Sequence, residues 1–204
     1  MNKRVEHWQE VYKNKDLQEV SWYQEKPETS IALIQKANLD KSAAIIDVGG
    51  GNSRLVDYLL NLGYTNLSVL DISEAALKNA QKRLGEKAKQ VNWILADVTD
   101  FKSDAKFDCW HDRATFHFLN NQEDIEKYRS LCNASIKPNG QLIVGAFSKK
   151  GPTKCSGLPT ANYSADGLSS IFEPEFRAVD CFTKDHLTPR NKVQNFQFCV
   201  FLKE

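Results

Sequence analysis

The stretch IIDVGGGNSRLVDYL, from Ile45 to Leu59, joins three kinds of sequence. An apolar run ends in an acid, three glycines follow, and the next residues have the spacing of a helix. Glycines let the backbone approach a ligand with no side chain in the way. The first turn of a helix adds free N–H groups with partial positive charge. This order predicts either a tight structural turn or a cradle for a ligand.

Short apolar runs alternate with longer helical patterns along most of the chain. The apolar runs predict strands at residues 43–47, 67–71, 91–96, 107–111 and 141–147. The helical patterns predict helices at residues 3–13, 28–37, 53–62, 73–84, 123–135 and 165–171. Strands without strict apolar–polar alternation are typical of a parallel sheet that is covered on both faces. Their alternation with helices predicts an α/β fold with a doubly wound sheet.

The C-terminal segment follows a different pattern. Apolar stretches at residues 177–183 and 193–202 are separated by the polar segment KDHLTPRNK, with no helix between them. Consecutive strands joined in this way predict an antiparallel hairpin. The segment KPNG at residues 137–140 predicts a turn before the fifth strand. The sequence therefore predicts a mostly parallel, seven-stranded sheet with an antiparallel C-terminal hairpin.

Length and composition narrow the class of protein. The 204 residues fit one domain over residues 1–204, with residues 1–40 as an N-terminal helical region. The net charge of +1 lacks the basic excess of a dedicated nucleic-acid-binding protein. No apolar run is long enough to cross a membrane. Because the polar start MNKRVEHWQEVYKNK has no apolar secretion core, we expect a cytoplasmic protein.

The five cysteines and four histidines show no metal-binding spacing. No Cys-x-x-Cys, His-x-x-x-His or His-Glu-x-x-His pattern occurs. Cys109, Cys181 and Cys199 lie in apolar or alternating runs, which favours small buried side chains over disulfides or zinc ligands. We expect no metal.

The acid in front of the glycines separates two classes of ligand. Dinucleotide-binding loops read Gly-x-Gly-x-x-Gly, and here the third glycine position holds Arg54. Asp47 lies two residues before Gly49, where a carboxylate repels a pyrophosphate and attracts a cation. The pattern favours an aminoacyl sulfonium, with its positive amino group, over NAD.

The segment DVGGGNS at residues 47–53 resembles motif I of the class I S-adenosylmethionine-dependent methyltransferases, acid-x-Gly-x-Gly-x-Gly, with Ser53 at the third glycine position. Other segments resemble further parts of this family in the same order: SVLDIS (68–73), WILADVTDF (93–101), FDCWHDRATFHFL (107–119) and KPNGQLIV (137–144). The resemblance covers nearly the whole chain. It implies the class I methyltransferase fold and S-adenosyl-L-methionine as cofactor.

The resemblance also implies particular cofactor contacts. Asp71 would hydrogen-bond the ribose hydroxyls, Asp97 would face the adenine amino group, and Val98 would present its backbone N–H. Taken alone, both acids also fit a cap for the turn or helix that follows. The residues expected to bind the cofactor are Trp22, Asp47, Gly49, Gly50, Gly51, Asn52, Ser53, Asp71, Ile72, Asp97, Val98 and His111.

Three polar residues that end the fourth strand are the catalytic candidates. By the resemblance, His111 and Arg113 lie near the cofactor and Asp112 lies near the acceptor. For methyl transfer from a sulfonium, the protein mainly has to position the nucleophile and exclude water. A general base is needed only if the acceptor is protonated. The alternative is that Asp112 and Arg113 pair with each other or cap a helix. For His117, packing on a helix face is favoured over a role as general base.

Two further segments have possible roles in function, each with a structural alternative. Ser21-Trp22-Tyr23-Gln24 suits a lid over the cofactor, and an anchor in the core is the alternative. The loop at residues 148–164 carries Cys155, which we expect to be the least buried cysteine, with Lys154 able to lower its pKa. An incidental loop thiol is favoured over a reactive one.

The motifs WHDRATFHFL, SWYQ and KCSGLP are similar to a compact bacterial-type subgroup, which is distantly similar to eukaryotic protein-lysine methyltransferases of the methyltransferase-like group. Nucleic-acid amino methyltransferases carry the motif Asn/Asp-Pro-Pro-aromatic where this chain has His-Asp-Arg-Ala, which argues against methylation of nucleobases. An arsenic methyltransferase would have several cysteines in its loops, whereas we find one here.

We therefore expect a methyltransferase, acting as a monomer or weak dimer, with a small-molecule acceptor, because no added substrate-recognition domain is evident. A protein lysine methyltransferase is the alternative. A further alternative, from a different functional class, is a module that binds the cofactor without catalysing methyl transfer. A nucleotide-dependent oxidoreductase is disfavoured by the glycine pattern and the C-terminal hairpin.

Overall fold

Seven strands form one sheet in the computed structural model, which describes residues 3–204 and leaves Met1 and Asn2 of the expected N-terminal region outside the described residues. Across the sheet the strands are β3 (Val91–Leu95), β2 (Asn66–Asp71), β1 (Ala44–Val48), β4 (Phe107–Arg113), β5 (Ile136–Phe147), β9 (Val193–Lys203) and β8 (Phe176–Leu187). β1 to β5 pair in parallel, whereas β9 pairs antiparallel with β5 and β8. This order confirms the predicted class I methyltransferase fold.

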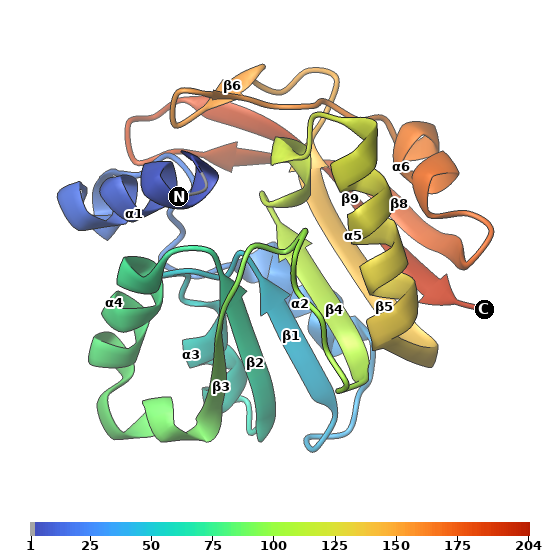
Figure 1. Cartoon of the computed structure of the whole chain (residues 1–204), viewed down its shortest axis with the longest axis horizontal. Coiled ribbons are helices and arrows are strands. Elements are labelled where there is room, and N and C mark those ends of the chain that lie inside the picture. The colour runs from blue at the N-terminus through green and yellow to red at the C-terminus, as the bar shows by residue number, and fades with distance from the viewer. Residues whose placement is uncertain (1–2) are drawn as a thin grey trace.

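Helices cover both faces of the sheet (Figure 1). They are α1 (Lys3–Asn14), α2 (Glu28–Lys36), α3 (Leu55–Asn61), α4 (Glu74–Leu84), α5 (Gln122–Ser135) and α6 (Ala165–Phe172). The hydroxyl or amide oxygens of Ser73, Asn121 and Ser164 accept a backbone N–H in the first turns of α4, α5 and α6. These caps satisfy N–H groups that a helix start leaves unpaired, so they fix where each helix begins.

Two apolar cores lie on opposite faces of the sheet. Consecutive strand residues divide between them: Ile45 packs in the core with α2 and α3, and Ile46 in the core with α5 and α6. Because both faces are buried, the strands need apolar residues at successive positions. This burial explains why the strand sequences lack alternation.

Some element boundaries differ from the sequence prediction. KPNG belongs to β5 rather than to a turn, and there Asn139 has a φ of 61° and the pairing with β4 shifts register between Phe107 and Cys109. The turn-forming residues are thus accommodated as an irregularity within a strand. The expected polar loop between the last strands is also shorter, because β8 continues to Leu187. The helix expected from Ser53 starts at Leu55.

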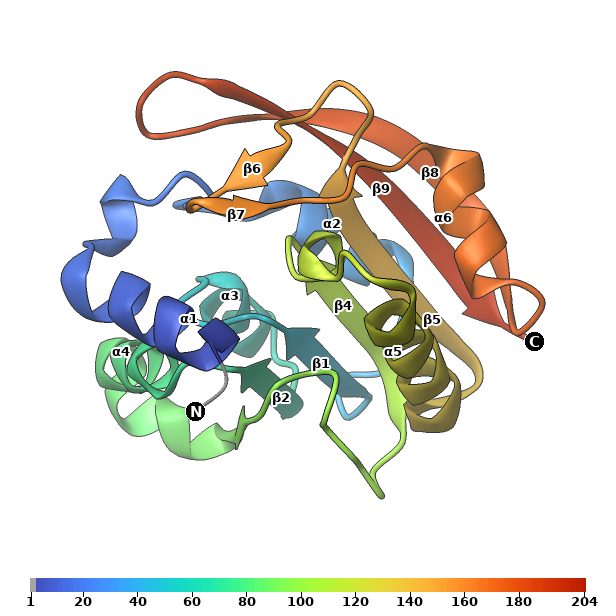
Figure 2. The same cartoon turned by 45° about the horizontal axis from the view of Figure 1, so that its top comes forward.

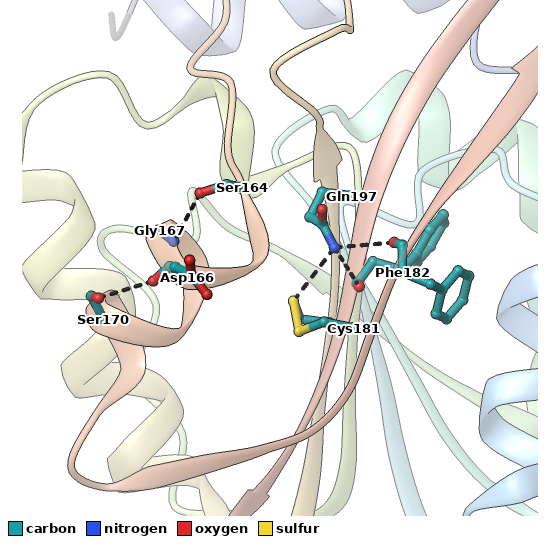
Figure 3. Close-up of a disulfide and its surroundings, with 9 residues drawn as sticks. Ser164, Asp166, Gly167, Ser170, Cys181, Phe182 and Gln197 are labelled. Atoms are coloured by element: carbon teal, nitrogen blue, oxygen red, sulfur yellow. Dashed lines mark hydrogen bonds between the residues drawn. A yellow bond between two sulfur atoms is a disulfide. The ribbon is translucent and has the colours of Figure 1, made fainter.

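A disulfide joins Cys181 on β8 to Cys199 on β9 (Figure 3), which corrects the prediction of small unpaired cysteines. The two residues are register partners, with their Cα atoms 4.2 Å apart. Beside them, the side-chain amide of Gln197 donates to the backbone oxygens of Phe182 and Phe198 at 3.1 Å each. The pairing depends on strand register, which cysteine spacing alone does not reveal.

Within residues 3–204, no helix combines the length and apolar character needed to cross a lipid bilayer. The same part of the chain contains no group of three or more His, Cys, Asp or Glu side chains arranged to hold a metal ion.

Candidate active site

The carboxyl ends of β1, β2 and β4 point toward the side of the molecule where α1 and a small hairpin lie (Figures 1 and 2). The hairpin consists of β6 (Lys154–Cys155) and β7 (Leu158–Pro159), within the loop at residues 148–164. In open α/β sheets this edge is the usual place for a ligand.

The glycine loop after β1 is packed so closely that only glycine fits. Gly49 and Gly51 have φ values of 65° and 46°, a region that side-chain-bearing residues rarely adopt. A Cβ on Gly49 would lie 1.7 Å from Thr115 Oγ1, and one on Gly51 would lie 2.7 Å from Asp71 Oδ2. The N–H groups of Gly49 and Gly50 donate to the backbone oxygen of Leu70, at 2.7 and 3.2 Å. The loop is therefore a rigid cradle of backbone rather than a merely flexible turn.

Arg83 of α4 holds the far end of this loop. Its guanidinium donates to the backbone oxygens of Asn52 and Ser53 at 3.1 and 2.8 Å, and to the Asn52 side chain. It also forms two bonds with the carboxylate of Asp57, at 3.0 and 2.8 Å. The sequence analysis missed Arg83, because this helix-to-loop contact leaves no local pattern.

A buried chain of hydrogen bonds starts at Asp47. His111 lies beside it on β4, in register, with Nδ1 2.7 Å from Asp47 Oδ1. The other ring nitrogen, Nε2, lies 2.9 Å from the hydroxyl of Ser30 at the start of α2. Both sides of the imidazole are thus held, and the acid before the glycines has a fixed direction. Ser30 is a second residue that the sequence analysis missed.

Asp71 and Asp97 end β2 and follow β3. Asp71 accepts the N–H of Ser73 at 2.8 Å, and burial raises the pKa of Asp71 to about 7. Asp97 accepts the N–H and hydroxyl of Thr99 at 3.0 and 2.8 Å, and lies 3.6 Å from Arg4 of α1. The expected capping contacts therefore exist, and both carboxylates also line a cavity.

Two neighbouring cavities occupy this edge of the sheet. The first encloses about 730 Å³ and the second about 510 Å³, counting their mouths. Of the expected residues, the first is lined by Trp22, Gly49, Asp71, Ile72, Asp97, Val98 and Arg113. The second is lined by Trp22, Asp47, Gly49, Gly50, Asn52, Ser53, His111 and Arg113. The expected residues that line neither cavity are Gly51 and Asp112.

Asp112 is directed away from the cavities. Its carboxylate is fully buried and accepts the N–H groups of Thr115 and Phe116 at 2.9 and 3.2 Å, and the hydroxyl of Tyr128 at 2.7 Å. Successive side chains on a strand point to opposite faces, so His111 and Arg113 share one side and Asp112 takes the other. The expected position of Asp112 near the acceptor is therefore corrected: it holds the turn after β4 against α5.

His117 and Cys155 also have defined surroundings. His117 is buried against the ring of Phe147, with centroids 4.3 Å apart, and burial lowers its pKa to about 3. The packing interpretation of His117 is thus confirmed. Cys155 was expected to be the least buried cysteine, but it is buried in the wall of the first cavity, and burial raises its pKa. The prediction of an exposed thiol with a lowered pKa is wrong, because β6 turns Cys155 inward.

Aromatic side chains from the N-terminal segment cover the first cavity. Trp8 of α1 contacts Trp22 and Phe118, with ring centroids 5.7 and 5.0 Å apart, and Tyr12 contacts Trp22 at 6.0 Å. The first cavity is lined by Trp8, Tyr12 and Trp22 from this segment. We refer to residues 3–24 as the N-terminal cover.

Hydrogen bonds attach the N-terminal cover to α4, β4 and β8, and Arg4 also donates to Asp124 of α5. The side-chain oxygen of Gln9 accepts the hydroxyl of Ser73 and the N–H of Ala75, at 3.0 and 3.1 Å. Arg113 donates to the backbone oxygen of Trp22 at 3.1 Å, and the His186 ring nitrogen lies 2.7 Å from the backbone oxygen of Ser21. The expected lid thus lies over the cleft, and its opening and closing stay a prediction.

The residues present fit S-adenosylmethionine. The two cavities share Trp22, Gly49 and Arg113 in their walls, so one extended ligand can reach into both. Asp71 and Asp97 line the first cavity, where a nucleoside would find acceptors for its hydroxyl and amino groups. Asp47 lines the second, where a positively charged amino group would find a carboxylate. A pyrophosphate would meet three acids here, so the charges disfavour NAD.

Comparison with known proteins agrees with this geometry. Residues 45–140 match the model of a methyltransferase domain family. EEF1A lysine methyltransferase 2 of Danio rerio is 30% identical over 208 residues, which cover 95% of this chain and 79% of that protein. At 23% identity, the match to eEF1A lysine and N-terminal methyltransferase of Mus musculus covers only 31% of that longer protein.

Solved structures share the fold. One, reported for the conversion of a disulfide bond into a thioacetal group during echinomycin biosynthesis, has a TM-score of 0.80 at 18% identity and covers 98% of this chain and 93% of that chain. Burkholderia thailandensis 1,6-didemethyltoxoflavin-N1-methyltransferase, solved with S-adenosylhomocysteine, has a TM-score of 0.70 at 17% identity, with coverage of 98% and 84%. The sequence matches and the cradle together show that the chain belongs to the class I S-adenosylmethionine-dependent methyltransferases.

Proposed function

We propose that this methyltransferase transfers the methyl group of S-adenosylmethionine to a small molecule. The observation that carries this proposal is the covered cleft: α1, Trp22 and the β6–β7 hairpin lie over the first cavity, and aromatic rings form much of its wall. A cavity covered in this way suits an acceptor that is small enough to lie completely inside it. It excludes water from the reacting atoms.

The chain's own residues supply position rather than proton transfer. S-adenosylmethionine, when bound, supplies a methyl group activated by its sulfonium, which an in-line nucleophile displaces. The glycine loop, held by Arg83, and the Asp47–His111–Ser30 chain keep the amino-acid end of the cleft rigid. His117 lines neither cavity, and both ring nitrogens of His111 are engaged. Since neither histidine is available as a base, we expect an acceptor that enters with a lone pair already available.

A protein lysine methyltransferase is the second candidate. It is favoured by the match to EEF1A lysine methyltransferase 2, which extends over 95% of this chain. In that case the lysine side chain would enter beneath the N-terminal cover, and the surrounding surface would dock the target protein.

Transfer of labelled methyl groups tests the proposal. The purified protein is incubated with methyl-labelled S-adenosylmethionine and a cell lysate that is then separated into small-molecule and protein fractions. Enzyme-dependent label in the small-molecule fraction is the expected result. Label confined to a protein band would overturn the proposal in favour of lysine methylation. The Gly49→Ala variant, whose Cβ would collide with Thr115, serves as the control that lacks a formed cradle.

A further inference from the structure

Arg113 presents a positive charge in the cleft that no acid of residues 3–204 neutralises through an ion pair. Its Nη1 donates to the backbone oxygen of Trp22, and the guanidinium carbon lies 4.8 Å from the centre of the Phe196 ring. Its Nη2 is buried and has no hydrogen-bond partner in the described part of the chain. A buried donor without a partner is unfavourable, so the site is incomplete without an acceptor atom.

The other arginines that line the cavities form ion pairs with acids. Arg4 pairs with Asp97 and Asp124, and Arg54 forms an ion pair with Glu25 at 2.8 Å. Asp71 lies in the first cavity at the end where the nucleoside would bind. Arg113 lines both cavities at their junction, which is where the two substrates would meet. It stays charged at neutral pH, since burial lowers its pKa only to about 10.

The wall near Arg113 is apolar. The same cavity is lined by Trp8, Trp22, Phe118 and Cys155. Of these residues, only Trp22 accepts a hydrogen bond from the guanidinium, through its backbone oxygen. A planar cation beside aromatic rings suits a flat ligand that carries a negative charge, because the guanidinium offers paired N–H donors to a carboxylate. A lysine ammonium in this place would meet a like charge.

The carboxylate of the cofactor has a different candidate partner. Arg54 carries the other buried guanidinium N–H without a partner, its Nε, and Arg54 lines only the second cavity, together with Asp47 and the glycine loop. An aminoacyl group bound there would meet the carboxylate of Asp47 and the guanidinium of Arg54. This leaves Nη2 of Arg113 for the second substrate.

We propose that Arg113 recognises a negatively charged group on the methyl acceptor, which is a small aromatic or apolar anion. This inference rests on the proposed small-molecule function and names its substrate class. It makes Arg113 a specificity-determining residue that distinguishes anionic acceptors from neutral or cationic ones.

Binding of two matched probes tests the inference without turnover. The protein is saturated with S-adenosylhomocysteine, and fluorine NMR measures the affinities of 4-fluorobenzoate and 4-fluorobenzamide, which share a ring and differ in charge. We expect the benzoate to bind at least about tenfold more tightly, the preference expected of a charged hydrogen bond in a buried site. Arg113→Gln should abolish this preference, and Arg113→Lys should retain part of it. Arg129→Gln on α5, a residue that lines neither cavity and pairs with Glu175, should leave it unchanged.

Calorimetry on the same variants separates the acceptor from the cofactor. Because Arg113 also holds the backbone of Trp22, any loss of affinity for S-adenosylhomocysteine in Arg113→Gln should be matched by an equal loss for 5′-methylthioadenosine. A preference for the benzoate that is absent, or that survives Arg113→Gln, would overturn the inference. So would an Arg113→Gln variant that loses affinity for S-adenosylhomocysteine but not for 5′-methylthioadenosine, because Arg113 would then hold the cofactor's carboxylate. Failure of the proposed function would be seen separately, as label on protein.

Discussion

The buried surroundings of Asp71 favour its protonated form, whereas its expected role in binding the ribose favours the ionised form. Burial raises its pKa to about 7, so much of the unliganded protein holds it protonated near neutrality. Two ribose hydroxyls are better bound by the ionised carboxylate, which accepts two hydrogen bonds. Binding should therefore draw a proton off Asp71, and cofactor affinity should depend on pH.

We expect the affinity for S-adenosylhomocysteine to rise between pH 6 and pH 8, because the ionised fraction of Asp71 rises through its pKa of about 7. Asp71→Asn should flatten this pH dependence and weaken binding at pH 8 by about 1–3 kcal/mol. Isothermal titration calorimetry at three pH values measures both effects. A wild-type affinity that stays constant with pH, or an Asp71→Asn variant of full affinity, would remove Asp71 from the ribose site.

Asp112 should matter for folding more than for binding. Asp112→Asn keeps one acceptor oxygen for Thr115 and Phe116 but faces Tyr128 with an amide N–H, so we expect the free energy of unfolding to fall by about 1–3 kcal/mol. Urea denaturation measures the loss, and calorimetry should show cofactor affinity within about twofold of the wild type. A variant of unchanged stability and greatly reduced turnover would restore the catalytic interpretation of Asp112.

The contrast between Asp112 and its neighbours shows what the sequence could predict at this scale. The motif HDR marks a strand end with functional side chains, and His111 and Arg113 do line the cleft. The strand's alternation alone implies that Asp112 points the other way. Ser30 and Arg83 carry no such signal, since each reaches the site across more than 25 residues of sequence.

At the scale of the elements, the glycine loop can be tested with a matched pair of substitutions. Gly49 and Gly63 both have positive φ, at 65° and 86°, but a Cβ on Gly63 would meet nothing within 4 Å. We expect Gly63→Ala to lower stability by about 1 kcal/mol and leave cofactor binding intact. Gly49→Ala should in addition abolish measurable binding of S-adenosylhomocysteine, because Thr115 would have to move. Equal behaviour of the two variants would show that the loop needs glycine only for its backbone angles.

Arg83 should position the loop without touching the cofactor. Removing its bonds to Asn52, Ser53 and Asp57 in Arg83→Ala should weaken S-adenosylhomocysteine binding about tenfold, the cost of holding a loosened loop in place. Arg83→Lys should not restore binding, since a lysine lacks the fork geometry. Lys87→Ala, which removes an exposed bond to Asn61 nearby, is the control. Full rescue by lysine would mean that only the charge matters.

The elements themselves were largely predictable, because apolar runs and glycine loops are local signals. The mostly parallel pairing and the antiparallel ending follow from such signals and from the family resemblance. The Cys181–Cys199 disulfide and the register shift in β5 do not, since both depend on how two strands align.

At the scale of the whole molecule, the helix α1 of the N-terminal cover buries few of its residues. α1 has one buried residue, Val11, whereas α5 has five. Few buried contacts allow local opening at low free-energy cost. A cofactor beneath Trp8 and Trp22 would add contacts to the cover that the unliganded protein lacks.

Hydrogen exchange should register this difference. We expect the amides of α1 to exchange faster than those of α5 in the unliganded protein, and to slow on addition of S-adenosylhomocysteine. The helix α6, which lies on the other side of the molecule from α1 (Figure 1) and lines neither cavity, should stay unchanged. Exchange in α1 that is as slow as in α5 and insensitive to the ligand would argue for a fixed wall instead of a lid.

A crystal structure with S-adenosylhomocysteine is the most direct test of this cofactor site. We predict the nucleoside beneath Trp8 and Trp22, with the ribose on Asp71, the adenine beside Asp97 and Val98, and the amino group toward Asp47. We also predict that Nη2 of Arg113 makes no bond to the cofactor and faces the part of the first cavity that the cofactor leaves open. A ligand outside this cleft would contradict the assignment of the donor site, and a cofactor carboxylate on Arg113 would contradict the proposed choice of an anionic acceptor.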